Sequence, residues 1–217
     1  MSGSAGTQDD HDAKRRLILR YARDAFMADG YAGARIEPIA REAGVSTATL
    51  YALFAGKAEL FNAVIDDAAA LFSSQMARVR ACDGDARKRL TSFAQAYADF
   101  MGDGFVRSVF RLVMAERSRF EDTARRFFEK GRGEFGLTLI GILKDHQARD
   151  ELKNIDKASW AAGELMGMIE HPVFFVPLVT GDEVKAARTH AEVVAHAIET
   201  FMARSEEHTS ELQSRAY

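Results

Sequence analysis

The 217-residue sequence has little cysteine and little proline: Cys82 is the only cysteine, and there are three prolines. One cysteine cannot form a disulfide within the chain and cannot supply a zinc site made of several cysteines. This cysteine usage fits a reducing compartment, so we expect a cytoplasmic protein. The few prolines, and the lack of alternating runs rich in Val, Ile and Thr, favour helices over strands.

Signals for a membrane are also lacking. Residues 1–12 are small, polar and acidic, without the basic start and apolar stretch of a signal peptide. No apolar run reaches the roughly 18–20 residues that a membrane span needs. We therefore expect no membrane partner, and we interpret residues 1–12 as a disordered tail.

Motifs of enzymatic chemistry are absent as well. The sequence has no glycine-rich phosphate loop, no nucleophile elbow and no paired His/Glu metal motif. We therefore predict no enzyme, no catalytic residues, no metal and no cofactor. A pocket with convergent ionisable groups would reopen the enzyme hypothesis.

Hydrophobic residues make up 47% of the chain, which is enough for a sizeable core. From Ala13 onward they recur at helical spacing, and this pattern predicts an all-α protein of about nine helices. The expected fold is a three-helix, helix-turn-helix head followed by a larger helical bundle. The stretches predicted for the bundle after a long helix from Lys57 are 86–101, 105–117, 120–147, 157–179 and 183–203, with a kink at Pro172 and Pro177.

Two short predicted helices, 35–43 and 47–54, carry the strongest functional signal. They are joined by Ala43-Gly44-Val45-Ser46, in which glycine permits a tight turn. This is the layout of a helix-turn-helix, whose second helix enters the major groove of DNA. Leu50 and Phe54, four residues apart, would face the core.

The other face of the second helix is suited to close approach to DNA. Ala48 and Ala52 are small, and a bulky or acidic face could not enter a groove about 12 Å wide. Thr47, Thr49 and Tyr51 supply hydroxyl groups for phosphates or base edges. We therefore predict a DNA-binding surface on this side of the helix.

The charge of this region differs from that of the rest of the chain. Residues 13–57 hold eight basic and four acidic residues, a balance of +4 in a protein of net charge −3, so the remainder carries −7. A basic head on an acidic body favours one docking orientation on a polyanion. The expected partner is double-stranded DNA.

Many residues of this segment stand in one register: Ile39-Ala40, Ala43-Gly44-Val45-Ser46, Thr49-Leu50-Tyr51, Phe54, Lys57 and Glu59-Leu60-Phe61. Together they resemble the signature of tetracycline-repressor (TetR) family regulators, over Ala13 to about Ile65. The resemblance implies homodimers that bind palindromic operators, usually repress transcription, and release DNA when a small molecule enters the body. By position it implies DNA contacts at Ser46, Thr49, Tyr51 and Lys57.

Two positions depart from that signature. Ala34 stands where the family often has a threonine that caps the helix and touches phosphate, and we expect Arg35 to replace this contact. Leu53 stands where histidine is common, which removes one polar contact. The candidate DNA-binding residues are Arg35, Ser46, Thr47, Ala48, Thr49, Tyr51 and Lys57.

We divide the chain into the tail 1–12, a helix-turn-helix DNA-binding domain at 13–57, a ligand-sensing and dimerisation domain at 58–203, and a tail at 204–217. Residues of the last two predicted helices, about 157–203, have apolar faces suited to a two-fold four-helix interface, so we expect a homodimer. Gly163 and Gly167, four apart, indicate close packing of a helix.

The predicted body is rich in Phe and Met, which suit a cavity for a small hydrophobic effector as well as a plain core. Tyr97 and His171 would supply hydrogen bonds to such a molecule. The candidate pocket residues are Phe72, Tyr97, Met101, Phe110, Met114, Phe128, Met166, His171 and Phe174.

An alternative function remains open at this stage: a dimeric regulator without a small-molecule effector, or an activator controlled by a protein partner. A tightly packed body would favour it. The polar string Arg204 to Ser214, RSEEHTSELQS, also resembles the translation of a common sequencing adapter. We interpret it as an assembly artefact, the alternative being an ordinary polar tail.

Overall fold

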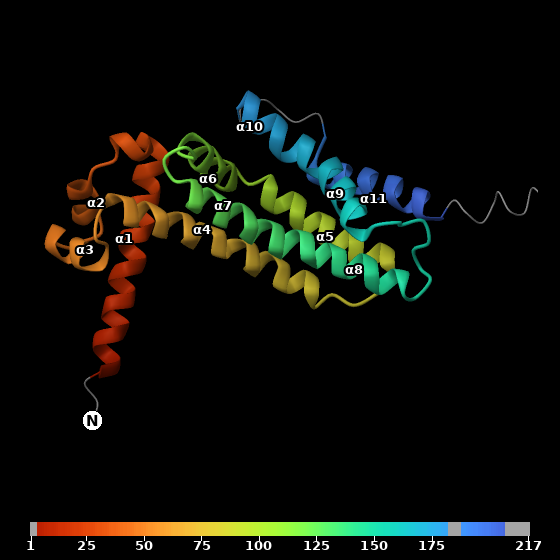
Figure 1. Cartoon of the computed structure of the whole chain (residues 1–217), viewed down its shortest axis with the longest axis horizontal. Helices are drawn as coiled ribbons and strands as arrows, with labels where there is room; N and C mark the ends of the chain where they lie inside the picture. The colour runs from red at the N-terminus through yellow and green to blue at the C-terminus, as the bar shows by residue number, and fades with distance from the viewer. Residues whose placement is uncertain (1–3, 182–187, 207–217) are drawn as a thin grey trace, which may run out of the picture. The chain divides into compact units, whose positions relative to one another are not determined.

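The computed structural model describes residues 4–181 and 188–206, with side chains described from residue 9 to residue 205 of those ranges. Within them the chain is helical and has no strand (Figure 1). Two π-helical turns, η1 and η2, continue into the α-helices beside them. Counting α7–η1–α8 and α9–η2–α10 as one helix each gives nine helices in the described ranges. The all-α prediction is confirmed.

The helices follow the apolar spacing of the sequence closely. Their bounds are α1 (Ser4–Gly33), α2 (Ile36–Glu42), α3 (Thr47–Leu53), α4 (Lys57–Arg80), α5 (Ala86–Met101), α6 (Gly104–Ala115), α7 (Glu121–Gly131), η1 (Arg132–Gly136), α8 (Leu137–Gln147), α9 (Ala158–Glu170), η2 (His171–Phe175), α10 (Val176–Thr180) and α11 (His190–Glu206).

The first helix differs from the expectation at its start. We expected residues 1–12 to be a disordered tail, but α1 begins at Ser4. An ion pair between Lys14 and Asp10, one turn apart, supports the polar turns that precede the apolar stripe. At the other end Gly30 has a positive φ of 68° and breaks the helical path.

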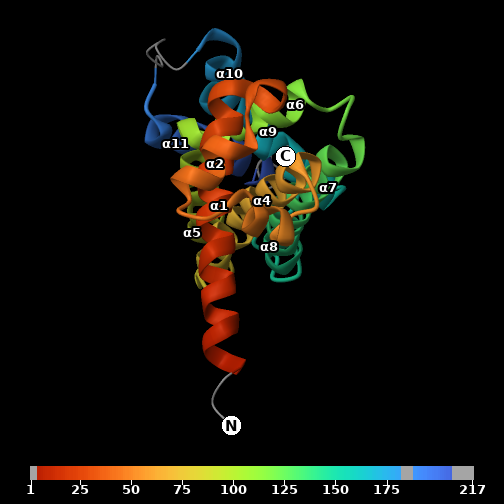
Figure 2. The ribbon, with the colours of Figure 1, turned by 90° about the vertical axis from the view of Figure 1, so that its left-hand side faces the viewer.

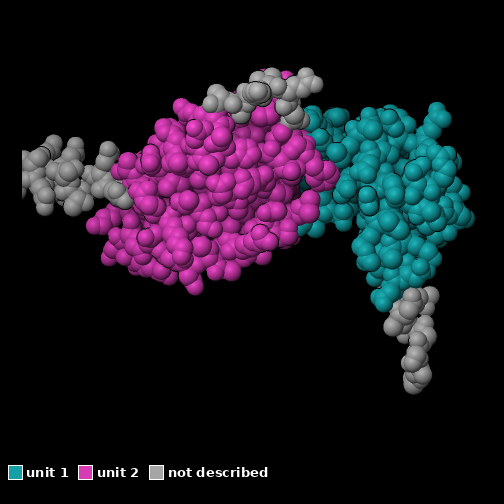
Figure 3. All heavy atoms as spheres, turned by 180° about the vertical axis from the view of Figure 1, so that it is seen from behind, with its two compact units in different colours: residues 1–70, 108–127 teal, residues 71–107, 128–217 magenta. Residues whose placement is uncertain are grey.

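The chain divides into two compact units, coloured separately in Figure 3. Unit 1 comprises residues 1–70 and 108–127, and unit 2 comprises residues 71–107 and 128–217. The predicted boundary at residue 57 separates only the three-helix head. Unit 1 also includes the first half of α4 and most of α6 and α7.

The core of unit 1 forms around the apolar side of α1. Ile18, Ala22 and Phe26 are each fully buried, and the ring of Phe26 meets that of Phe61 edge-on at 5.3 Å. Leu50 of α3 is also fully buried. Helix α3 packs against α2, and the burial of Leu50 turns one side of α3 towards the core, which leaves its opposite side exposed.

In unit 2, α5 packs against α8, α9 and α11. Its core is aromatic: Phe135 lies 5.2 Å from both Tyr97 and Phe100, and 5.6 Å from Phe72. We call these four residues the aromatic core. Pro172 lies within η2, so the predicted kink takes the form of a π-helical turn in a continuing helix.

The segment Ala158–Thr180 has the length and composition of a membrane span, although we expected no such run. A single helix of this kind does not indicate a membrane protein, because core helices of soluble proteins can have the same length and composition. Only 28% of its apolar window is buried. Trp160, Phe175 and Val179 are 68%, 52% and 68% exposed. Within the described residues, this apolar face is incompletely covered.

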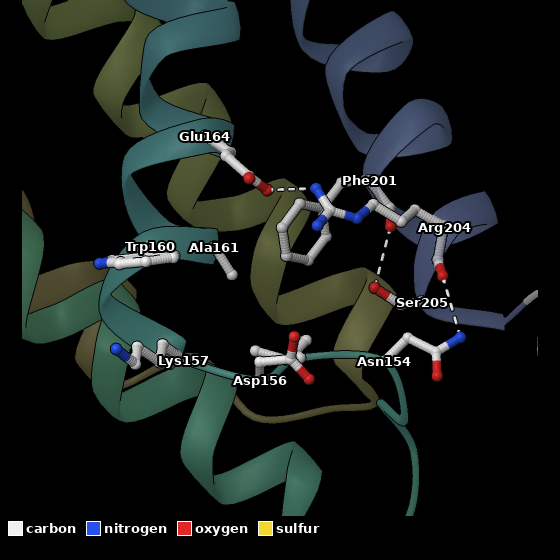
Figure 4. Close-up of a pocket in the computed structure, with 10 residues that line it drawn as sticks. Asn154, Asp156, Lys157, Trp160, Ala161, Glu164, Phe201, Arg204 and Ser205 are labelled. Atoms are coloured by element: carbon white, nitrogen blue, oxygen red, sulfur yellow. Dashed lines mark hydrogen bonds and ion pairs between the residues drawn. The ribbon is translucent and has the colours of Figure 1, made fainter.

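Helix α11 ends at Glu206, three residues inside the segment that we assigned to the tail. Residues 183–187 of the helix predicted at 183–203 lie outside the described residues. Ser205 is buried and donates to the carbonyl of Phe201, Arg204 forms an ion pair with Glu164, and the carbonyl of Arg204 accepts from Asn154 (Figure 4). These contacts lie around an open pocket between α9 and α11.

Candidate nucleic-acid interface and buried core site

The turn between α2 and α3 has the geometry that the sequence predicts. Gly44 has φ of 69°, a conformation that side-chain-bearing residues rarely adopt. The amide of Val45 donates to the carbonyl of Ala40 at 2.9 Å, and that of Gly44 to Arg41 at 3.1 Å. These bonds end α2 sharply and turn the chain into α3.

Helix α3 is capped by Ser46. The side-chain oxygen of Ser46 accepts from the amide of Thr49 at 3.0 Å and lies 2.8 Å from the Thr49 hydroxyl. Such a cap stabilises a helix by about 1 kcal/mol. The two predicted DNA contacts Ser46 and Thr49 are therefore joined to each other, and together they fix the start of the helix.

The outward face of α3 is formed by the other predicted residues. Thr47, Ala48 and Ala52 are exposed, and Tyr51 is 50% exposed. No acidic residue lies in α3. A small, hydroxyl-bearing and uncharged surface therefore stands on a seven-residue helix whose inner side is held by Leu50. Such a surface can enter a major groove.

The two predicted cationic contacts differ in their surroundings. Arg35 is exposed at the N-cap of α2 and makes no capping bond with its side chain. Lys57 is half-buried at the start of α4. Its ammonium group donates to the carbonyl of Ala32 at 3.1 Å and lies 4.8 Å from the ring centroid of Tyr31. To bind a DNA phosphate, the Lys57 ammonium group would have to leave these two partners or bind the phosphate in addition to them.

Sequence analysis missed the residues that surround Lys57. Tyr31 lies between Lys57 and Arg119, whose guanidinium carbon is 5.0 Å from the ring centroid. Phe120 stacks on Phe61 at 4.5 Å and meets Tyr31 edge-on at 4.8 Å. The segment between α6 and α7 therefore completes a separate cluster of aromatic rings in unit 1. No local pattern reveals this contact, because it joins residues about ninety positions apart.

The candidate pocket residues fall into two groups. Phe72, Tyr97, Met101 and Phe174 are buried in unit 2, and Met166 is half-buried there. The hydroxyl of Tyr97 already has a partner within the protein, because it donates to the carboxylate of Glu170 at 2.9 Å. Burial, and secondarily the charge of Glu170, raises the pKa of Tyr97 well above its ordinary value.

The remaining candidates lie elsewhere. Phe110 and Met114 belong to unit 1, where Phe110 meets Phe127 edge-on at 5.0 Å and Met114 is half-exposed. Phe128 is 67% exposed, and His171 is exposed and stacked on Phe175. These four do not join the aromatic core.

Both π-helical turns border the aromatic core. Phe135 of η1 is one of its members, and η2 follows directly after Glu170, the partner of Tyr97. The carbonyl of Val173, in η2, lies 3.5 Å from the guanidinium of the buried Arg107. π-Helical turns are rare and often occur at functional sites, because they shift a side chain relative to the regular helix. A candidate ligand site therefore centres on Tyr97 and Phe135.

Comparisons with known proteins give separate matches for the helix-turn-helix region and for the helical body. Residues 18–64 match the family described as bacterial regulatory proteins, tetR family. Residues 88–205 match the family described as AefR-like transcriptional repressor, C-terminal domain. The helix-turn-helix and the helical body are thus both matched.

Individual proteins are also similar. The HTH-type transcriptional activator FasR of Mycolicibacterium smegmatis is 32% identical over 96 residues, 44% of either chain, so the match spans less than half of that relative. A TetR-family regulator structure from Mesorhizobium loti is 25% identical, with a TM-score of 0.72 over 89% of this chain and 96% of that one. Bacillus subtilis FadR in complex with stearoyl-CoA is 18% identical, with a TM-score of 0.66 over 87% and 98%. The last shows a shared fold.

Proposed function

Because the chain belongs to the TetR family of bacterial DNA-binding transcription regulators, we propose that it is a cytoplasmic homodimeric repressor, released from a palindromic operator by a small hydrophobic effector. The exposed face of α3 carries this proposal. Thr47, Ala48 and Tyr51 stand outward on a helix that Ser46 caps and Leu50 anchors. A rigid helix with this face is the form in which a helix-turn-helix reads the major groove.

A substitution on this face tests the DNA-binding part. Tyr51→Ala removes a half-exposed side chain without opening the core, so the melting temperature should stay constant. We expect affinity for a duplex selected from a random pool to fall about tenfold or more, the loss of 1–3 kcal/mol typical of one base-reading contact. Phe128→Ala, an equally simple truncation of an exposed ring in unit 2, is the matched control. Unchanged affinity in Tyr51→Ala would show that another surface binds DNA.

The dimer is supported by the incompletely covered apolar face of α9 and α10. Gly163 and Gly167 are exposed, and a Cβ added at either would meet nothing within 4 Å. On α11 the exposed residues include Ala191 and Ala195. Small residues on both helices permit the close helix packing of a two-fold four-helix interface, with Trp160 at its edge.

The effector is supported by the chemistry around the aromatic core. Tyr97 is one of the four buried rings of the aromatic core, and its bond to Glu170 adds one polar pair beside them, so an apolar molecule with one hydrogen-bonding group fits this site best. FadR, of similar fold, was captured with stearoyl-CoA. We therefore extend the proposal to acyl-chain or aromatic effectors.

To release DNA, an effector must bind the DNA-free shape more tightly, by about 1.4 kcal/mol for each tenfold loss of operator affinity. A thermal-shift screen of fatty acids, acyl-CoAs and flat aromatic compounds, followed by operator titration with each hit, measures this coupling. Tyr97→Phe should reduce the shift caused by a genuine hit. Hits that stabilise the protein and leave operator affinity unchanged would contradict the release mechanism.

A second candidate is an activator, or a regulator that needs no small molecule. The similarity to FasR, described as an activator, favours it. A reporter placed behind the selected operator distinguishes the two, because a repressor lowers its expression and an activator raises it.

A further inference from the structure

Helix α1 has a basic side that none of the assigned DNA contacts includes. Between Lys14 and Arg23 the sequence holds five basic residues, the others being Arg15, Arg16 and Arg20, and no acidic residue. The match to the family's N-terminal region begins only at residue 18, so the first three of them precede it. Three of the five, Arg15, Arg16 and Arg20, are called the basic side of α1.

These three arginines are open to solvent. All are exposed, and no carboxylate among the described side chains lies within ion-pair distance of any of them. The neighbouring basic residues differ, because Lys14 pairs with Asp10 and Arg23 lies 3.5 Å from Asp24. Arg16 and Arg20 are one turn apart and therefore share a side of the helix. Their charges are thus uncompensated.

Arg15 also adjoins the recognition helix. Its guanidinium carbon lies 5.2 Å from the ring centroid of Phe54, the C-cap residue that follows α3. Arg15 is one turn before Ile18, where the buried side of α1 begins. Figures 1 and 2 show the N-terminal turns of α1 continuing beyond α2 and α3. Arg15 thus lies beside the C-terminal end of α3, and Arg16 and Arg20 follow it on the same helix.

We propose that Arg15, Arg16 and Arg20 of α1 bind phosphates of the DNA backbone beside the groove that receives α3. This proposal rests on the proposed DNA-binding function and adds a second contacting element to the head. Guanidinium groups suit phosphate oxygens, and phosphate contacts position a protein on the duplex without reading its sequence. The acidic residues Asp9, Asp10 and Asp12 limit the contact to the part of α1 that follows them.

The salt dependence of DNA binding tests this contact. Each phosphate neutralised contributes about 0.9 to the slope of log affinity against log salt concentration. The triple variant R15A/R16A/R20A should therefore lower the slope by about 2.7, on the selected operator and on unrelated duplex alike. The ratio of wild-type to variant affinity should then fall about 40-fold between 50 and 200 mM salt.

Two further variants separate a local contact from net charge and from misfolding. R78A/R87A/K144A removes three exposed charges from unit 2, without an ion pair among the described residues, and should keep the wild-type slope. R15K/R16K/R20K keeps the charges of α1 and should retain most of the slope. Circular dichroism and melting should be unchanged in all three.

The outcomes distinguish this proposal from the function on which it rests. If the wild-type protein selects an operator, Tyr51→Ala weakens binding and R15A/R16A/R20A keeps the wild-type slope, α1 makes no phosphate contact and the proposed function stands. An equal loss of slope in R78A/R87A/K144A would likewise overturn the proposal. If the wild-type protein selects no duplex at all, both the α1 contact and the proposed function are wrong.

Discussion

Glu134 is the centre of a polar network in unit 2, and its substitution tests how the aromatic core is held. Its carboxylate accepts from the hydroxyl of Ser73 at 2.6 Å and lies 3.1 Å from both Arg80 and Lys130. Ser73 and Arg80 belong to α4, whereas Glu134 lies in η1 directly before Phe135. The network therefore ties the π-helical turn to α4.

The electrostatics give the expected magnitude. The hydrogen bond from Ser73, followed by Lys130 and Arg80, lowers the pKa of Glu134 from 4.5 to about 2, against an opposing contribution from partial burial. A difference of that size corresponds to at most about 3.4 kcal/mol. Arg80 and Lys130 are nearly half exposed, so solvent screening reduces it, and we expect Glu134→Gln to lose about 2 kcal/mol at pH 7.

The same pKa fixes the sign of the pH dependence. Because the folded-state pKa is depressed, the stabilisation is complete above about pH 4.5 and disappears as the pH falls towards 2. The difference between wild type and Glu134→Gln should therefore be constant from pH 5 to pH 7 and should shrink below that range.

Urea unfolding followed by circular dichroism, at pH values from 7 down to 3, measures both effects. Glu129→Gln, which alters an exposed carboxylate five residues earlier on α7, is the matched control and should change stability by less than about 0.5 kcal/mol. Equal stability of wild type and Glu134→Gln at pH 7, or a difference that grows on acidification, would refute this reasoning.

Other expected outcomes concern the dimer and the chain end. Light scattering should give about 48 kDa for wild type, twice the chain mass of 24.0 kDa, and a monomer for Gly167→Glu, which adds a charge to the open helix face. Gly141→Glu, equally free of steric conflict on α8, should stay dimeric, and dimers in both variants would exclude this interface. Truncation after Glu206 should leave the melting temperature unchanged. Truncation after Ala203 removes the buried Ser205 and the Arg204 ion pair and should lower it by roughly 2–8 °C; equal melting of both forms would contradict the packing of the last turn.

The features that sequence analysis predicted well depend on local chemistry. Gly44 needs a positive φ, Ser46 caps the next helix, and Leu50 anchors its inner side. Each follows from residues within one or two turns of the chain. The exposed face of α3 could therefore be derived residue by residue, and the helix bounds 86–101 were found as predicted.

The features that it missed depend on contacts between distant segments. Tyr31 meets Arg119, and Tyr97 donates to Glu170, seventy-three positions later. Apolar spacing shows that such residues are buried, but not which partner each one has. The π-helical turns were missed for a different reason, since a change in helical pitch leaves the composition of a segment unaltered. The candidate pocket residues belong to two different units, and the Phe and Met content of the sequence does not predict this division.

Selection of duplex DNA from a random pool tests the central claim most directly. A two-fold dimer with α3 as its reading helix should enrich an inverted repeat whose half-site centres are about 34–36 Å, or one helical turn, apart, or a multiple of that spacing. Competition should show a selected duplex bound at least about a thousandfold more tightly than unrelated DNA. A pool that stays random after repeated rounds, with wild-type protein folded and dimeric, would contradict the account.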